Sequence, residues 1–241
     1  MNPARQGRIG MALATAIIAT WTALHLYAVF LFDWNAPWAL PQAAVLAVLL
    51  TWLSVGMYIV AHDAMHGSLW PARRAGGDLV GRLALLLYAG FSFGRIKPKH
   101  DLHHRHSGSA QDPDFAVAHA SRPLRWYLQF LTTYFGWREL AVMALRVSAY
   151  LLLGASVWNI LLFFAVPGIV SSLQLFYFGT FLPHRHIDGH GAAQFADHHR
   201  ARSNEFGYLL SLLTCFHFGY HHEHHLRPGT PWWRLPGARS R

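Results

Sequence analysis

Long stretches without a charged side chain are the feature that most restricts how this chain can fold. Residues 9–32 and 36–61 are each long enough to cross a bilayer, which takes roughly 20 mostly apolar residues in a helix. Residues 147–183 form another such stretch, long enough for most of two helices with a turn at residues 154–159. If the third helix begins within residues 139–146, the sequence predicts about four transmembrane helices.

The amino-acid composition agrees with a membrane protein. Hydrophobic residues make up 53% of the 241 residues and charged residues only 13%, about half the share of a typical soluble domain. Residues 83–94, 126–135 and 207–220 are apolar but too short to cross, and they predict interfacial or re-entrant helices. We therefore expect one all-α integral membrane domain over residues 1–241, with no internal repeat.

Charge and cysteine content exclude several classes of site. The net charge is +9, with 20 Lys and Arg against 11 Asp and Glu, and in a membrane protein this excess is expected on loops facing an anionic leaflet rather than on a nucleic-acid surface. Cys215 is the only cysteine, so no intramolecular disulfide, iron–sulfur cluster or thiolate zinc site can form. The first apolar run is too long for a signal-peptide core, which predicts a retained helix.

The positions of the basic residues predict the orientation in the membrane. The turns at residues 33–35 and 154–159 contain no Lys or Arg, and every basic residue lies on the other side or, for Arg146, at its edge. We expect Arg146 to extend its long side chain to that interface. Because cytoplasmic loops are enriched in Lys and Arg, that side is predicted to be the cytoplasm, with both termini there.

Histidine is the residue type that indicates chemistry in this chain. There are 18 histidines, and the informative ones form four clusters at predicted cytoplasmic positions. The clusters are His62 and His66 in HDAMH, His100, His103 and His104 in KHDLHH, His184 and His186 in LPHRH, and His221, His224 and His225 in GYHHEHHL. Chance predicts roughly 0.1 copies of H-x-x-H-H in such a chain, and two are present.

The predicted topology brings these clusters to one membrane face. The second and fourth helices both return to the cytoplasmic side, and the other clusters lie in the following loop and in the C-terminal tail. Residues four apart on a helix point the same way, so His62 and His66 can offer both imidazoles to one site. In H-x-x-H-H the middle histidine is displaced around the helix, so each triplet can supply two ligands to one metal and one to its neighbour.

The number of ligands favours two metal ions. A single zinc takes about four ligands, whereas the clusters offer about nine well-placed histidines. Imidazole suits Zn, Cu, Fe and Ni alike, so ligand type alone does not choose the metal. Three acidic residues inside the clusters are candidates to orient the imidazoles, and the alternative for each is an ordinary solvated charge. These residues are Asp63, Asp101 and Glu223.

Other histidines are interpreted differently, and the alternative for the clusters themselves is that they are solvated loop residues. His25, alone in the first helix, is expected to be a packing or interfacial residue rather than a ligand, and His106, His119 and His190 are assigned to ordinary loop positions. The roles of His198, His199, His217 and His222 stay open. His186 and His199 are also candidates to bind metal or to contact a ligand.

The clusters and the strings around them resemble a known family. H-x-x-x-H, H-x-x-H-H and H-x-x-H-H across a basic-inside protein with four spans are similar to the membrane fatty-acid desaturase and hydroxylase superfamily. More narrowly, residues 52–236 resemble the bacterial β-carotene ketolases. The strings that carry this resemblance are WLSVGMYIVAHDAMHGSLWP, TYFGWREL, LQLFYFGTFLPHRH and ARSNEFGYLLSLLTCFHFGYHHEHHLRPGTPWWRLP.

The resemblance implies a set of cofactors and ligands. It implies two non-haem iron ions (Fe²⁺), molecular oxygen as co-substrate, and electrons from reduced ferredoxin. Eight histidines are implied ligands, and His184 matches a further one near the end of the fourth span. The eight are His62, His66, His100, His103, His104, His221, His224 and His225. His217 lies near a position that relatives fill with another polar residue, so it is a candidate tenth ligand or a contact of one.

The implied reaction is oxidation of carbon 4 of a β-ionone ring to a ketone, by two hydroxylations and loss of water. β-Carotene would give echinenone and canthaxanthin, and zeaxanthin would give astaxanthin. The protein would hold the ring at the metal and exclude water, with no catalytic acid or base of its own. A carotenoid dissolves in the bilayer, so the implied location is the bacterial inner membrane, among membrane lipids, with the metal site facing the cytoplasm.

Basic residues near the second cluster form a candidate docking surface for the acidic ferredoxin. They are Arg73, Arg74, Arg95, Lys97, Lys99 and Arg105. The competing explanation for them is the positive-inside rule alone.

Other functions are compatible with part of the pattern. A carotenoid β-ring hydroxylase or a fatty-acid desaturase would share the metal site, and only the product distinguishes them from a ketolase. A membrane metal transporter is the alternative from another class. Transporter ligands tend to lie near the middle of the membrane, whereas the predicted spans here are almost free of ionisable groups.

Overall fold

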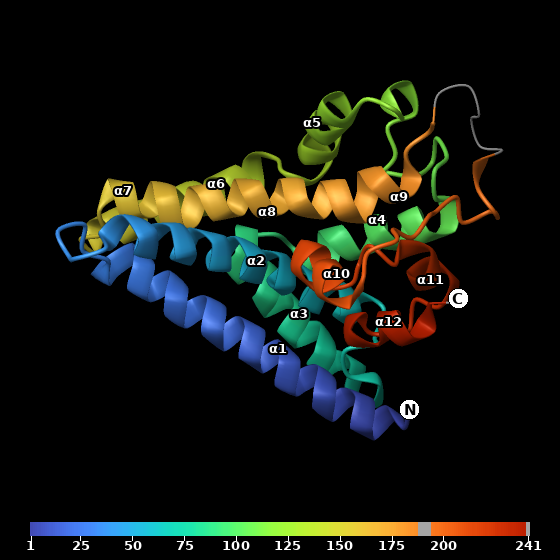
Figure 1. Cartoon of the computed structure of the whole chain (residues 1–241), viewed down its shortest axis with the longest axis horizontal. Coiled ribbons are helices and arrows are strands. Elements are labelled where there is room, and N and C mark those ends of the chain that lie inside the picture. The colour runs from blue at the N-terminus through green and yellow to red at the C-terminus, as the bar shows by residue number, and fades with distance from the viewer. Residues whose placement is uncertain (188–193, 240–241) are drawn as a thin grey trace.

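The part of the chain that the structure describes is helical. The computed structural model describes residues 1–187 and 194–239, and these residues contain helices and no β-strand. Helix α1 (Pro3–Leu26) continues as a π-helical turn (Tyr27–Leu31), and α2 (Ala39–Met65) runs back beside it (Figure 1). The side chain of Asn2 accepts a hydrogen bond from the first turn of α1, a common signal for the start of a helix.

The next two helices form a sharply bent pair. Helices α3 (Arg74–Ala89) and α4 (Phe93–His106) meet at an angle of 102°. Gly90 ends α3 with a φ of 66°, a left-handed conformation that glycine adopts without strain. The outer ends of both helices lie on the right of Figure 1, at the wide end of the molecule where both termini also lie, as in a re-entrant hairpin. Residues 83–94, which the sequence predicts as a short interfacial or re-entrant piece, form the tip of this hairpin.

Arg146 of α6 (Trp137–Leu152) holds this tip in place. Its guanidinium donates hydrogen bonds to the carbonyl oxygens of Leu87, at 2.6 Å, and of Leu86, in the last turn of α3. A cation at the C-terminal end of a helix also complements the helix dipole. This contact between α6 and α3 was not predicted from the sequence, and the extension of Arg146 to the membrane interface stays a prediction.

The second half of the chain contains one long helical rod and several short helices. The rod consists of α7 (Val157–Ile160), a π-helical turn (Leu161–Ala165), α8 (Val166–Phe176), a second π-helical turn (Tyr177–Phe181) and α9 (Leu182–His184). The shorter helices are α5 (Pro123–Tyr134), α10 (Tyr208–Cys215), α11 (His221–Leu226) and α12 (Leu235–Ala238). Within the described residues, 3₁₀ turns include Pro71–Arg73, Val117–His119 and Trp232–Arg234.

Three described helices are long and apolar enough to cross a membrane. They are Pro3–Leu31, Ala39–Met65 and Val157–His184, and the bent pair is a fourth candidate if its two halves are counted as one span. The predicted third crossing corresponds to α6, which is helical as expected but has only 16 residues. At 1.5 Å per residue it is about 24 Å long, shorter than the roughly 30 Å hydrocarbon core.

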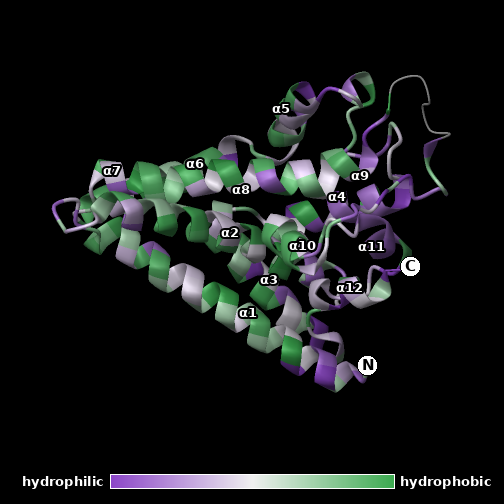
Figure 2. Cartoon of the chain, in the orientation of Figure 1, coloured by the Kyte–Doolittle hydropathy of each residue, from purple (hydrophilic) through white to green (hydrophobic). Residues whose placement is uncertain are grey.

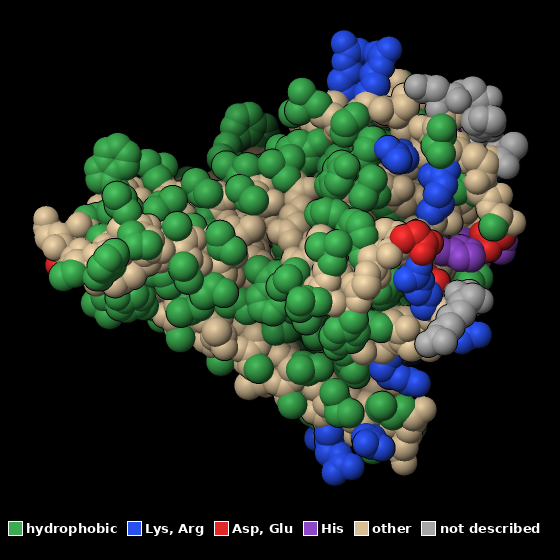
Figure 3. Space-filling view, in the orientation of Figure 1, with side chains coloured by type: hydrophobic (Ala, Val, Ile, Leu, Met, Phe, Trp, Pro, Cys, Tyr) green, Lys and Arg blue, Asp and Glu red, His purple; other side chains and the backbone are tan. Residues whose placement is uncertain are grey.

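The surface of the long helices is apolar. Hydrophobic side chains cover the narrow end and the middle of the molecule, whereas Lys and Arg gather at the wide end and at the start of α1 (Figures 2 and 3). Leu152, the last residue of α6, is 88% exposed, and Trp38, just before α2, is 79% exposed. Large contiguous apolar surfaces of this kind are unfavourable in water and are expected where a protein contacts lipid.

Two hydrophobic clusters fill the interior. The larger joins α1, α2 and α3 to the long helical rod and contains the buried side chains of Leu50, Met57 and Phe163. The smaller attaches α5 to the end of α8 through Trp126 and Phe176. Helix α5 is therefore a separate layer on the rod (Figure 1).

Candidate metal centre

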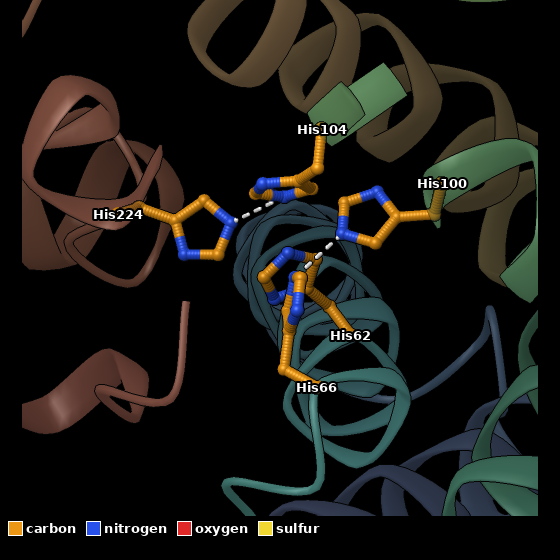
Figure 4. Close-up of side chains that lie close together, drawn as sticks. All are labelled: His62, His66, His100, His104 and His224. Atoms are coloured by element: carbon orange, nitrogen blue, oxygen red, sulfur yellow. Dashed lines mark hydrogen bonds between the residues drawn. The ribbon is translucent and has the colours of Figure 1, made fainter. Parts of the chain in front are cut away.

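Five histidines from three helices form the first group of candidate ligands. Each offers a ring nitrogen, and these nitrogens all lie within 4.8 Å of one another. The group, which we call site 1, consists of His62, His66, His100, His104 and His224 (Figure 4). The rings point toward a common centre from α2, α4 and α11. Helices that are distant in the sequence thus converge on one point.

Four further histidines form a second group, which we call site 2. It consists of His103, His184, His221 and His225, and all four side chains are buried. The two groups adjoin each other, because the ring centroids of His104 and His225 are only 4.3 Å apart. All nine histidines predicted as ligands from the sequence therefore lie in one of these two groups.

Helical spacing explains how the residues divide between the two sites. On α4, His100 and His104 are four residues apart and face site 1, whereas His103 faces site 2. On α11 the arrangement is reversed, because His221 and His225 face site 2 and His224 faces site 1. Each H-x-x-H-H triplet thus contributes two side chains to one group and its middle histidine to the other, as its geometry predicts.

The ring nitrogens of site 1 are spaced as the ligands of one metal ion would be. The Nε2 atoms of His66 and His100 are 2.7 Å apart, and those of His104 and His224 are 3.0 Å apart. Both ring nitrogens of His62 are buried without a hydrogen-bond partner among the described residues. A metal–nitrogen distance of about 2.1 Å places two ligands of one ion up to about 4.2 Å apart, close to the observed spread.

The protonation state of the rings also suits metal binding. Burial, and then the neighbouring imidazoles, hold the pKa values of His221, His224 and His225 well below the usual value. These three rings are therefore neutral near pH 7. Neutral imidazole is the form that donates a lone pair to a metal.

Hydrogen bonds fix the orientation of two site 2 histidines. The Nδ1–H of His103 donates to the carboxylate of Asp112, with both oxygens at 3.0 Å. Asp112 itself accepts hydrogen bonds from the amides of Gly108 and Asp114, each at 2.8 Å. The Nδ1–H of His184 donates to a backbone carbonyl oxygen at 2.8 Å. In both rings Nε2 is left free for site 2, a common arrangement for metal-binding histidines.

Asp112 is a candidate site residue that the sequence analysis missed. Its position was not distinctive in the sequence, because it follows the second cluster in a loop and belongs to no H-x-x-H-H spacing. The string QDPDF after the cluster was the available signal. Burial opposes ionisation of Asp112, but the adjacent His103 and the hydrogen bonds to its carboxylate lower its pKa overall. It is therefore an anionic acceptor for His103.

The three acidic residues predicted to orient imidazoles have other partners. Asp63 lies 3.8 Å from Nδ1 of His62, too far for a hydrogen bond, and accepts one from the amide of Trp232. Asp101 forms an ion pair with Lys97 at 2.7 Å. The carboxylate of Glu223 accepts a hydrogen bond from Ser203. Among the described residues, none of the three is hydrogen-bonded to a histidine of either site.

The remaining candidate histidines lie outside both groups. His186 packs against Phe115, and the ring of His199 is 6.0 Å from that of His225. His217 is buried between aromatic rings, among them Tyr208 at 4.5 Å, and belongs to neither group. His25 stacks on a tryptophan and hydrogen-bonds to Tyr150, which agrees with the predicted packing role.

The other described histidines, whose roles were left open or assigned to loops, belong to neither site. His222 is hydrogen-bonded to one carboxylate oxygen of Asp197 at 2.8 Å, and the other oxygen accepts a hydrogen bond from the amide of His199. The ring of His198 lies against that of His199. His106 is exposed at the end of α4, and His119 ends a 3₁₀ turn. His190 lies outside the described residues.

The predicted basic docking surface is only partly available. Arg73, Arg74, Arg95 and Arg105 are exposed. The ammonium group of Lys97 is paired with Asp101, and that of Lys99 donates to the carbonyl oxygen of Thr133. The four arginines are therefore the members of this set that an acidic partner could contact.

A largely apolar pocket reaches both sites. It lies between the two hydrophobic clusters, with α5 on one side and α2, α3 and the helical rod on the other. His100 of site 1 and His103 and His221 of site 2 line it. The other lining residues are Tyr58, Tyr88, Phe91, Ile96, Asp114, Tyr127, Phe130, Leu131, Tyr134, Ser172, Leu175, Gly179, Thr180 and Phe218.

Comparison with known proteins identifies the family. The family model for fatty acid desaturases matches residues 36–144 and 130–241. The chain is 50% identical to a β-carotene ketolase of Paracoccus sp. (strain PC1), over 96% of this chain and 93% of that protein. It is 35% identical to a β-carotene ketolase of Haematococcus lacustris, over 95% and 78% respectively, and 37% identical to a zeaxanthin 4-ketolase of Chlamydomonas reinhardtii, over 99% and 55%. The chain therefore belongs to the fatty acid desaturase family and, within it, to the β-carotene ketolases.

Proposed function

We propose that this protein is a di-iron oxygenase of the cytoplasmic membrane that converts the carbon-4 methylene of β-ionone rings to a ketone. The observation that carries this proposal is the 50% identity to a β-carotene ketolase over 96% of the chain. Site 1 would hold one iron ion and site 2 the other. Iron bound there would supply the activation of molecular oxygen that an unactivated methylene requires.

The protein's own residues would bind and orient the substrate. The pocket presents apolar side chains such as Ile96, Leu175 and Phe218 next to the histidines, and these suit a hydrocarbon ring. Because the pocket reaches both sites, it would hold one ring carbon against the metals and keep bulk water out. Asp112 would keep His103 in the tautomer that leaves Nε2 free.

A carotenoid substrate explains why such an enzyme is embedded in a membrane. The substrate dissolves in the bilayer, and apolar helix surfaces would place the pocket within reach of it. Each hydroxylation consumes one O₂, two electrons and two protons and releases one water, and two hydroxylations at one carbon followed by loss of water give the ketone. The electrons would come from reduced ferredoxin on the cytoplasmic side, where the wide end of the molecule would lie.

The exposed arginines give this electron donor a testable docking surface. We expect Arg95→Glu combined with Arg105→Glu to raise the KM for reduced ferredoxin several-fold and to weaken the dependence of the rate on salt, because steering by opposite charges is screened by ions. Turnover driven by a small uncharged reductant should not change. Equal KM values and equal salt dependence would leave the positive-inside rule as the explanation of these arginines.

Pigment analysis in a bacterial host that makes β-carotene tests the proposed function directly. Expression of the chain should yield echinenone and canthaxanthin, which chromatography separates from β-carotene. Ring-hydroxylated pigments would instead show a hydroxylase that uses the same metal sites. Unchanged β-carotene, with the protein inserted and loaded with iron, would overturn the ketolase proposal.

A further inference from the structure

The hydroxyl groups around the pocket fall into two classes. Three tyrosine hydroxyls are hydrogen-bonded within the protein. Tyr88 pairs with Ser171 at 3.0 Å, Tyr127 pairs with Ser172 at 2.7 Å, and Tyr134 donates to the carboxylate of Asp114. These three groups have their partners already and do not require a ligand.

Tyr58 and Thr180 form the second class. Both line the pocket, and neither hydroxyl has a hydrogen-bond partner within residues 1–187 and 194–239. Threonine in a helix commonly bonds back to a carbonyl one turn earlier, and Thr180 does not. Leaving a polar group without a partner in an apolar pocket is unfavourable, so two such groups together indicate a polar ligand.

The two residues occupy matching positions beside the two sites. Tyr58 precedes His62 of site 1 by four residues on α2, and Thr180 precedes His184 of site 2 by four residues on the helical rod. On α2 this separation corresponds to one turn, or about 6 Å. The two hydroxyls therefore approach the pocket from different helices, one turn away from the candidate ligands.

We propose that Tyr58 and Thr180 are specificity-determining residues that hydrogen-bond a hydroxyl group on carbon 3 of the substrate ring. This inference rests on the proposed ketolase function. Carbon 3 is bonded to carbon 4, so a ring held with carbon 4 at the metals presents its 3-hydroxyl beside them. A site built to pair with a substrate hydroxyl disfavours the analogue that lacks it, because its own polar groups are then left unpaired. The pocket thus favours the 3-hydroxylated ring over the unsubstituted one.

A competition experiment tests this specificity. Membranes containing the protein, reduced ferredoxin and equal amounts of β-carotene and zeaxanthin would be assayed for the ratio of keto products from each. Tyr58→Phe and Thr180→Val remove one hydroxyl each with little change in shape. Each should lower the zeaxanthin-to-β-carotene product ratio by roughly two- to tenfold, the range for one net hydrogen bond. Tyr88→Phe is the matched control, because it removes a pocket hydroxyl that Ser171 already engages, and its ratio should equal that of the wild type.

The outcomes separate this inference from the function on which it rests. A reduced ratio in both variants, with β-carotene still converted, supports the inference and shows that the variants fold. An unchanged ratio overturns it, as would be the case if the two hydroxyls only bind water. Conversion of β-carotene but not of zeaxanthin by the wild type also overturns it and leaves the ketolase function intact. If the wild type converts neither, the proposed function fails and the inference fails with it.

Discussion

At the scale of single residues, the most informative contact is the one between His103 of site 2 and Asp112, which belongs to neither site. Asp112 holds Nδ1 of a buried histidine, and amides from its own loop hold Asp112. Loss of the group that accepts a hydrogen bond from a metal-binding histidine typically lowers metal affinity or activity about 10- to 100-fold. We therefore expect Asp112→Ala to reduce both the iron content of the purified protein and the ketolase rate by about that factor.

A graded series makes this prediction specific. Asp112→Asn keeps an oxygen acceptor and should retain more iron than Asp112→Ala. Asp33→Asn, in the loop at the opposite end of the molecule, makes the same chemical change without touching a histidine and should match the wild type. Normal iron content in Asp112→Ala would show that His103 is oriented by packing alone.

His103 itself provides the most direct test of a ligand. In His103→Ala site 2 loses one of four imidazoles, so we expect iron and activity to be lost while the protein still inserts into the membrane. His106→Ala is the matched control, since His106 is exposed three residues further along the same helix and belongs to neither site. Metal analysis and pigment yield measure the two effects, and full activity in His103→Ala would remove this residue from the site.

Residue spacing was sufficient to predict which histidines gather but not what surrounds them. Six of the nine histidines form i, i+4 pairs that the sequence alone shows, namely His62 and His66, His100 and His104, and His221 and His225. Asp112 and the pocket residues Tyr58 and Thr180 could not be found in this way. Their positions depend on how a loop and three helices pack together, and no periodic pattern records that packing. The assignment of the nine histidines as iron ligands stays a prediction.

At the scale of elements, the α3–α4 hairpin depends on a contact that joins residues far apart in the sequence. Arg146 donates to the carbonyl oxygens of Leu86 and Leu87 in the last turn of α3, and that of Leu86 also accepts a hydrogen bond from the amide of Gly90. Arg146→Leu would leave these acceptors without a charged partner, at a cost of about 1–3 kcal/mol. We expect a lower melting temperature for the detergent-purified variant. Arg125→Leu, which changes an exposed arginine on α5, should melt as the wild type does.

The elements themselves were predictable to different degrees. The three long helices follow from uncharged stretches of sufficient length, and the structure has helices there. The bend of 102° was not predicted, because it depends on the left-handed Gly90 and on capping by Arg146 from α6. The third span was expected within residues 139–153, and the corresponding helix α6 is shorter than a full crossing.

At the scale of the whole molecule, the two ends differ in chemistry. Both histidine sites and both termini lie at the wide end, and the turn between α1 and α2 lies at the narrow end (Figure 1). Between them the surface is apolar, so a bilayer would separate the two ends. The fold therefore predicts that residues of the wide end and of the narrow turn are accessible from opposite sides of the membrane.

Cysteine labelling measures this orientation, because Cys215 is the only native cysteine and is fully buried. Glu205→Cys places a thiol at a position that is 92% exposed at the wide end, and Asn35→Cys places one in the exposed narrow turn. A membrane-impermeant maleimide added to intact spheroplasts should label Asn35→Cys only, and in inverted vesicles it should label Glu205→Cys only. The reverse pattern would place the histidine sites outside the cytoplasm, away from the proposed electron donor. Labelling of both variants from one side would mean that α1 and α2 do not cross the bilayer.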